Sequence, residues 1–303
     1  MPAYDLRRYL FRGEQKMPYE IMHGYRKNDA MRASFNRLAK ETFGLDFEPW
    51  YQNGFWNEKY DPHSIVVGGE VVANVSVNRI DGNLDGEERH YIQLGTVMTK
   101  PEFRNRGLIR AIMDYIKAEY AACDGIYLYA GDDVCSFYPK FGFEKAPEVR
   151  WSLDFRPEGA ASAQKVPMEN AGDWAAFLAA KKELVSAGIF RPDADDLYMF
   201  YLSQFMRDCV YFVPEHNAYV IAEADGSVLH ISDILSPGPI SLRDICAEFG
   251  SEFERFIFAF RPFDVSGLGS FDYIEEDTTF FVQGEPLLSD LALIGSFTPI
   301  THA

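Results

Sequence analysis

Two arginines and a glycine lie in a short turn between an expected strand and an expected helix. The strand ends before Pro101, and Arg104, Arg106 and Gly107 lie in the turn before the helix begins at Leu108. The first N–H groups of a helix lack partners within the helix and lie at the positive end of its dipole. A glycine lets a phosphate approach the main chain, and guanidinium groups add charge and donors. The turn therefore suits a phosphate-bearing ligand, although an ordinary solvated helix start has the same composition.

The elements around this turn alternate between strands and helices. Residues 108–120 have apolar side chains at helical spacing, which predicts an amphipathic helix. Gly68 and Gly69 predict a tight hairpin turn, and residues 81–86 predict a longer one. The other elements expected in this half are a strand at 4–11, a helical segment at 18–47, strands at 65–67, 71–75, 91–99 and 126–130, a short helix at 133–140 and a strand at 148–155.

The second half repeats part of this order of elements. After helical segments at 172–187 and 196–206, a hairpin leads to Pro237, a helix at 241–249 and an apolar strand at 256–260. The order of turn, strand, proline, helix and strand matches that of residues 86–130, without a match of residues. Small and polar residues at 156–163 indicate a linker, so the sequence predicts two domains, 1–155 and 156–303.

Composition and charge limit the classes of function. The 303 residues are 47 % hydrophobic and 15 % aromatic, which is enough for two domain cores. The chain through Asp154 has 23 acidic and 20 basic residues, whereas the remainder has 23 acidic and 9 basic, a net charge of −14. Such a surface repels nucleic acid and attracts cations. Solubility alone would also explain it.

Neither a membrane nor a metal partner is indicated by sequence motifs. No stretch approaches the roughly 20 apolar residues of a membrane span, and the amino terminus lacks the apolar region of a secretory signal. We therefore expect a cytoplasmic protein. The four cysteines, which predict buried side chains in a reducing compartment, are far apart and have no histidine at ligand spacing: Cys123, Cys135, Cys209 and Cys246.

The turn resembles motif A of the GNAT N-acetyltransferase superfamily, whose acetyl-CoA loop is Arg/Gln-x-x-Gly-x-Gly/Ala. Arg104 and Gly107 match this loop, and Ile109 departs from it. Residues 136–143, Ser-Phe-Tyr-Pro-Lys-Phe-Gly-Phe, resemble the Phe-Tyr-x-Lys-x-Gly-Phe signature of motif B. The resemblance covers roughly residues 4–155. It implies an α/β fold with a mixed, twisted GNAT sheet and helices on both faces, followed by a second, degenerate GNAT-like domain.

A closer resemblance is to the tandem-GNAT branch that includes the enhanced-intracellular-survival type aminoglycoside acetyltransferases. It is based on the Arg-x-Arg-Gly-Leu-Ile run and on the apparent second, degenerate half. Those enzymes have an additional sterol-carrier-like carboxy-terminal domain, for which we expect this chain to be too short. Their use of the terminal carboxylate as a base is therefore not transferred to Ala303.

The resemblance also implies roles for individual residues. Tyr138 occupies the position of the family's general acid, and a phenol with a pKa of about 10 keeps its proton at neutral pH. The alternative for Tyr138 is a packed aromatic. The residues implied to bind acetyl-CoA are Val97, Met98 and Thr99 along the pantetheine arm, and Arg104, Asn105, Arg106, Gly107, Leu108, Ile109 and Arg110 around the pyrophosphate.

Other parts of the site have no motif. The family's frequent Asn after the strand at 126–130 is replaced here by Gly131-Asp132-Asp133. The candidates for a general base are His23, His63, His90, Glu20 and Glu58, each of which has a structural alternative. Six aromatic residues predict either an acceptor pocket or a core: Phe47, Trp50, Tyr51, Phe55, Trp56 and Tyr60.

The second half lacks both motifs, because prolines at 237 and 239 replace N–H donors where the repeat places the phosphate turn. The resemblance of the first half implies an acetyl-CoA-dependent N-acetyltransferase without a metal, which acetylates a primary amine of a cationic small molecule or peptide. The alternatives are a non-catalytic acetyl-CoA-binding or sensor protein and an enzyme for a longer acyl-CoA. Two acidic clusters, Asp193, Asp195, Asp196 and Glu275, Glu276, Asp277, face either a cationic acceptor or solvent. A homo-oligomer is left open.

Overall fold

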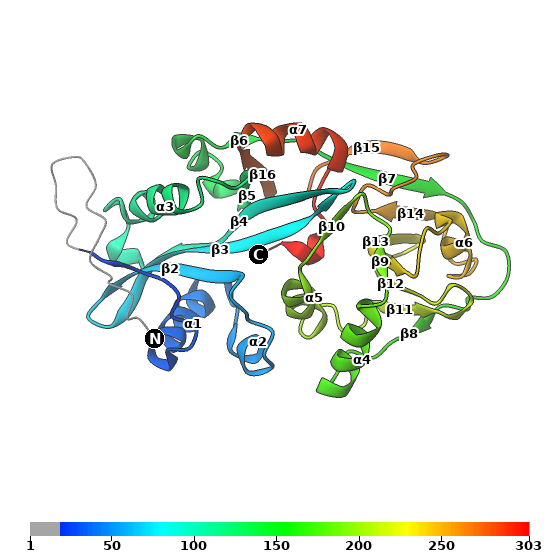
Figure 1. Ribbon diagram of the computed structural model, residues 1–303, viewed down its shortest axis with the longest axis horizontal. Helices are drawn as coiled ribbons and strands as arrows, with labels where there is room; N and C mark the ends of the chain where they lie inside the picture. The colour runs from blue at the N-terminus through cyan, green and yellow to red at the C-terminus, as the bar shows by residue number, and fades with distance from the viewer. Residues whose placement is uncertain (1–18, 303) are drawn as a thin grey trace.

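The computed structural model describes residues 19–302 and is built on two mixed β-sheets, which lie side by side in Figure 1. The strand expected at residues 4–11 lies outside the described residues. Helices α1 (Asp29–Phe43) and α2 (Glu48–Gln52) lie on one face of the first sheet, and α3 (Leu108–Glu119) lies on the other (Figure 1). The α/β class and the helices on both faces agree with the GNAT-type fold that the sequence predicts.

The first sheet has the strand order β1-β2-β3-β4-β5-β16-β6, and β10 pairs with β3. Within it β4 and β5 are parallel, and the other pairs are antiparallel. Its strands are β1 (Ile21–Met22), β2 (Tyr60–Val67), β3 (Glu70–Leu84), β4 (Glu87–Thr99), β5 (Gly125–Gly131), β6 (Glu144–Lys145), β10 (Phe190–Pro192) and β16 (Thr278–Gln283).

The second sheet has the order β15-β7-β14-β13-β12-β11-β8, and β9 pairs with β13. Its strands are β7 (Glu148–Asp154), β8 (Gln164–Lys165), β9 (Val185–Ser186), β11 (Val210–Val213), β12 (Ala218–Asp225), β13 (Val228–Ser236), β14 (Arg255–Phe258) and β15 (Gly269–Tyr273). The later helices are α4 (Ala171–Lys181), α5 (Asp195–Leu202), α6 (Leu242–Ala247) and α7 (Glu285–Ile294).

The two sheets share a repeated unit. In the first, the hairpin β3–β4 leads through α3 to β5, which is parallel to β4. In the second, the hairpin β12–β13 leads through α6 to β14, which is parallel to β13. The repeat of elements predicted from the sequence is therefore present.

Apolar faces determine how the helices pack, and capping residues determine where they begin and end. Ile112, Met113 and Ile116 of α3 are fully buried against the first sheet, as the helical spacing predicts. Helix α1 begins where the Asn28 side chain accepts a hydrogen bond from the Met31 N–H. The helical segment expected at 18–47 is shorter, because Gly44 ends α1 in the left-handed region, with φ of 73°.

Two local predictions are corrected by the structure. The turn between β3 and β4 is only Asp85-Gly86, with φ of 49° and 93°, rather than all of residues 81–86. The strand continues to Leu84 because β10 pairs with its end. The helix expected at 133–140 is instead two short 3₁₀ turns, Asp132–Val134 and Tyr138–Phe141. Pro139 lies in the second of these turns and cannot donate a helical hydrogen bond.

The sheets exchange strands across the expected domain boundary. The strand β7, which closes the predicted first domain, pairs with β14 and β15 of the second sheet. In return β16, from near the end of the chain, lies between β5 and β6 of the first sheet. A division at residue 155 therefore does not separate the two sheets, because each contains a strand from the other segment.

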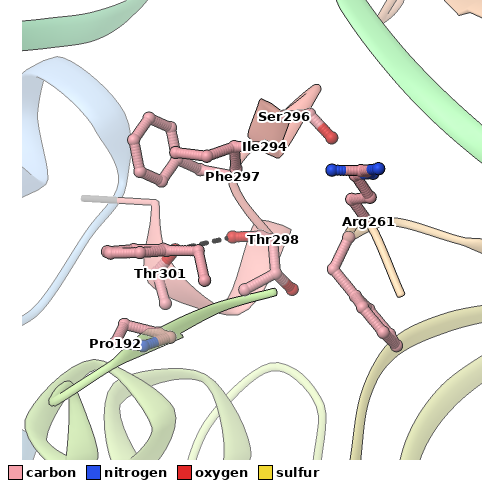
Figure 2. Close-up of a pocket in the computed structure, with 9 residues that line it drawn as sticks. Pro192, Arg261, Ile294, Ser296, Phe297, Thr298 and Thr301 are labelled. Atoms are coloured by element: carbon pink, nitrogen blue, oxygen red, sulfur yellow. Dashed lines mark hydrogen bonds between the residues drawn. The ribbon is translucent and has the colours of Figure 1, made fainter. Parts of the chain in front are cut away.

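A continuous core joins the sheets. It includes Tyr91 and Tyr127 of the first sheet, Tyr198 of α5 and Ile221 of the second sheet. A cavity of about 20 Å³ at this junction, large enough for one water molecule, is shown in Figure 2, where the Thr301 hydroxyl donates to Thr298 O. None of the helices within residues 19–302 combines the length and apolar character needed to cross a bilayer.

Candidate active site

The parallel strands β4 and β5 diverge part-way along their length. They pair from Tyr91 with Gly125 to Leu94 with Leu128. Beyond that point β5 remains paired with β16 on its other side, and β4 remains paired with β3. The edge of β4 from residue 95 to 99 that faces β5 has no partner among the described strands. Its backbone groups are therefore free to pair with an extended ligand.

A bulge lies at the start of this open edge. Residues Thr96 and Val97 of β4 stand opposite a single residue of β3, and Thr96 has φ of 42°. Buried side chains hold this conformation. The Thr96 hydroxyl is 2.9 Å from the Tyr60 hydroxyl, and Asn74 Nδ2 donates to Thr96 O at 3.0 Å. The bulge is therefore fixed by the polar core beneath it rather than by a ligand.

The turn after β4 presents free backbone donors. Asn105 and Gly107 have φ of 60° and 74°, and Gly107 caps α3 without a side-chain hydrogen bond. The Ala111 N–H bonds to Gly107 O, so the N–H groups of residues 108–110 precede the first internal hydrogen bond of α3. A Cβ added at Gly107 would meet no atom within 4 Å, which means that this approach to the backbone is open.

The two arginines of the turn are exposed and partly positioned. Arg104 Nε donates to Thr99 O at 3.3 Å, which connects the turn to the end of β4. Arg106 donates to Glu102 O at 2.6 Å, and its guanidinium lies 4.9 Å from the centre of the Phe103 ring. Both guanidinium groups therefore retain donors for an anion.

Tyr138 lies in the 3₁₀ turn Tyr138–Phe141, on the α3 side of the sheet. Its ring is buried, with Phe137 at 5.5 Å and Phe281 at 5.6 Å between ring centres. Burial, followed by the nearby Cys135 and Asp133, raises the pKa of Tyr138 to about 12. Its hydroxyl forms no hydrogen bond within residues 19–302, so the proton is held and not shared with this part of the protein.

The segment that forms this strand bulge, these divergent parallel strands and this open helix start matches a known family. Residues 26–146 match the family described as the acetyltransferase (GNAT) domain. The chain carries a GNAT acetyltransferase domain. The domain is that of an acyltransferase, and it contains both motifs identified in the sequence. No curated protein sequence gives a significant match.

Solved structures match beyond the GNAT domain. A probable N-acyltransferase from Enterococcus faecalis V583 has a TM-score of 0.55 and 14 % identity, covering 90 % of this chain and 74 % of that one. A GCN5-related N-acetyltransferase from Kribbella flavida has 0.53 and 17 %, covering 90 % and 73 %. Eis1 from Mycobacterium abscessus has 0.48 and 14 %, covering 82 % and 69 %. The first two matches extend the shared fold through the second sheet.

The equivalent opening in the second sheet is filled by the chain itself. After β13 and β14 diverge, β9 pairs with Leu235 and Ser236 of β13, and the Ala187 N–H donates to Ile234 O. The strand β9 thus lies where the GNAT domain leaves β4 open. The space that remains beside it is a cavity of about 620 Å³, whose lining includes Arg191 and Arg243.

A titratable carboxyl missed by the sequence lies on the opposite face of β5 from α3. Tyr129 follows Leu128, the last residue of β5 that pairs with β4, and the Tyr129 hydroxyl donates to Glu148 Oε1 at 3.4 Å. Burial and the neighbouring Glu275 raise the pKa of Glu148 to about 7. His302 stacks on Tyr129 at 3.7 Å between ring centres, so the chain returns to this point just before Ala303, which lies outside the described residues.

The candidate bases named from the sequence lie elsewhere. His23 and His63 stack on each other and contact Tyr115 of α3, and the His90 side chain pairs with Asp81, one residue before β4 begins to pair with β5. Glu58 pairs with Arg26 at the surface. Glu20 is exposed beside β1.

The aromatic and acidic groups named from the sequence are largely structural. Phe47, Trp50, Trp56 and Tyr60 are buried in the core beneath α1. In the first acidic cluster Asp193 pairs with Lys59 and Asp195 with Lys181, whereas Asp196 is buried. The carboxylate of Asp132, after β5, accepts a hydrogen bond from Thr279 of β16.

Proposed function

We propose that this protein is an acetyl-CoA-dependent N-acetyltransferase that acts on a primary amine of a cationic acceptor. The observation that carries the proposal is the open edge of β4 next to an uncapped start of α3. Backbone groups of Val97, Met98 and Thr99 would pair with the pantetheine arm. The turn from Arg104 to Arg110 would bind the pyrophosphate through N–H groups and guanidinium donors.

Direct transfer needs an acid and a base. The amine nitrogen attacks the thioester carbonyl carbon, a C–N bond forms, and the C–S bond breaks. Tyr138 gives its proton to the departing sulfur, which is supported by its protonated and unshared hydroxyl. A backbone N–H of the β4 bulge would stabilise the oxyanion.

Glu148 is the base in this proposal. An amine must lose a proton to react, and the most effective base has a pKa near the working pH. A pKa of about 7, a buried position and a hydrogen bond to Tyr129 beside the opening support this role. The net charge of −14 after Asp154 favours acceptors that carry several amines, such as polyamines, aminoglycosides or basic peptides.

Calorimetric titration with acetyl-CoA tests the binding half of the proposal. We expect the Arg104→Ala, Arg106→Ala double variant to lose roughly 1.5–3 kcal/mol of binding free energy per charged hydrogen bond. The matched control is the double variant Arg79→Ala, Arg156→Ala, which removes two exposed arginines outside the turn and should bind as the wild type does. Failure of the wild type to bind acetyl-CoA would exclude both enzyme and sensor.

Thiol release during an amine screen tests transfer itself. Turnover with any amine, reduced in Tyr138→Phe, supports the enzyme. A protein that binds acetyl-CoA but releases no thiol with any amine fits the sensor alternative. This alternative is considered because Ile109 departs from the family's acetyl-CoA loop. The remaining alternative is an enzyme for a longer acyl-CoA. Comparison of acetyl-CoA with longer acyl-CoA substrates in the same assay distinguishes it from an acetyltransferase.

A further inference from the structure

Three potential metal ligands meet on the far side of β2 from the core beneath α1. They are His23, which follows β1, His63 of β2 and Glu119 near the end of α3, and their ligand atoms all lie within 4.8 Å of one another. The two imidazole rings are stacked, with centres 4.7 Å apart and planes inclined by 7°. This cluster plays no part in the transfer proposed above.

Hydrogen bonds show which ring nitrogen donates in both imidazoles. His23 Nδ1 lies 3.1 Å from Asp61 Oδ2, and His63 Nδ1 lies 2.9 Å from Asp61 O. A carboxylate and a carbonyl oxygen can only accept, so each Nδ1 carries a hydrogen. In the neutral form of each ring, Nε2 then presents its lone pair. Metal-binding histidines have this same arrangement, in which Nδ1 donates to a carboxylate or carbonyl.

The Nε2 atom of His63 is buried and has no hydrogen-bond partner among the described residues. The His63 side chain is 0 % exposed, and Nε2 lies 3.5 Å from Glu119 Oε2. A lone pair that faces a carboxylate is unfavourable unless a proton or a metal ion lies between them. His23 Nε2 is 3.1 Å from the Tyr115 hydroxyl, which is also close enough to be a fourth ligand.

We propose that His23, His63 and Glu119 bind a divalent transition metal ion, with Zn²⁺ as the best fit. Two imidazole nitrogens and one carboxylate oxygen are a common Zn²⁺ set, completed by water or by Tyr115. Ligands of a tetrahedral ion stand about 3.4 Å apart, so rotation of the Glu119 and His23 side chains would close the site. Asp61 positions both histidines. The ion would connect β1 and β2 to α3, the helix that begins at the phosphate turn.

Cobalt is a spectroscopic probe for this site. The full-length protein is treated with a chelator, dialysed and titrated with Co²⁺. We expect one ion per chain, the intense visible absorption of tetrahedral Co²⁺, loss of this absorption on addition of Zn²⁺, and a higher melting temperature with Zn²⁺ than with chelator.

Variants decide whether these residues are the ligands. His23→Asn and Glu119→Gln change partly exposed side chains and should remove the absorption while the circular dichroism spectrum is retained. His90→Asn, at an exposed histidine outside the cluster, should bind Co²⁺ as the wild type does. The proposal is wrong if the wild type binds no Co²⁺, which would leave His63 paired with Glu119 alone, or if both ligand variants keep the wild-type spectrum and affinity.

Discussion

Asn74 Nδ2 donates a hydrogen bond to Thr96 O across 3.0 Å, and Thr96 is the residue of β4 with positive φ. Asn74 also accepts a hydrogen bond from the Ser64 hydroxyl and donates to that of Ser76. One buried amide on β3 therefore satisfies the carbonyl that the bulge removes from the strand ladder. The shape of the open edge depends on this side chain.

Asn74→Ala should destabilise the protein by about 3 kcal/mol, because Thr96 O loses its side-chain donor and the buried Ser64 and Ser76 hydroxyls each lose one partner. Acetyl-CoA affinity should fall as well, since the bulge loses its support. Urea unfolding and calorimetry measure the two effects. Asn53→Ala, at an exposed position after α2, should change stability by less than about 0.5 kcal/mol.

Gly107→Ala should weaken acetyl-CoA binding more than its effect on folding explains. A residue with a Cβ at φ of 74° costs about 1 kcal/mol, and its Cβ would project into the space left for the phosphates. Gly44→Ala is a matched control, because Gly44 has φ of 73° and also meets nothing within 4 Å. Equal binding by the two variants would contradict a phosphate at Gly107.

Tyr138→Phe should lower kcat by at least about 100-fold, the contribution typical of a general acid. Stability and the KM for acetyl-CoA should change little, because the lost hydroxyl forms no hydrogen bond within residues 19–302. Stopped-time thiol release and thermal melting provide the measurements. A variant with wild-type kcat would make Tyr138 a packed aromatic.

The pH profile should report Glu148. A general base acts when it is deprotonated, so kcat/KM should rise as the pH increases through about 7. In Glu148→Gln this rise should disappear and kcat should fall. If the variant retains the same rise, the amine loses its proton to another group.

The same carboxyl should affect stability in the opposite direction. The folded-state pKa of Glu148 is raised from 4.5 to about 7, so between these values the folded protein holds a proton that the unfolded chain has released. The free energy of unfolding should therefore fall by roughly 3 kcal/mol as the pH rises through this window. Urea unfolding of Glu148→Gln should lack this decline, whereas the exposed control Glu144→Gln should keep it.

Local motifs explain which parts of the site could be predicted. The strand end, the turn with Arg104 and Gly107 and the helix start lie within one short segment, so the sequence suggested phosphate binding there. The role expected of Tyr138 came from the resemblance to the GNAT motifs. Glu148 gave no such signal, because its raised pKa depends on burial in the folded chain and on Glu275, and its hydrogen bond comes from Tyr129. The histidine cluster was equally hidden, since α3 and β2 meet only in the folded chain.

Strand pairing explains the part of the organisation that the sequence did not predict. Residues 278–283 and 148–154 have ordinary strand composition, and nothing in either segment specifies its neighbour. Alternation of apolar residues predicts that a strand exists but not which sheet it joins. The exchange of β7 and β16 is therefore a property of the tertiary fold, beyond the reach of periodicity.

The position of β16 has a consequence for synthesis of the protein on the ribosome. Its partner strand β5 is Gly125–Gly131, whereas residues 278–283 emerge after all the other described strands have been translated. Until then β5 exposes an unpaired edge that can pair with other chains, and a truncated product keeps that edge permanently. The first sheet is thus completed after all the other described strands, so a chain interrupted before β16 yields an aggregation-prone fragment with an incomplete sheet.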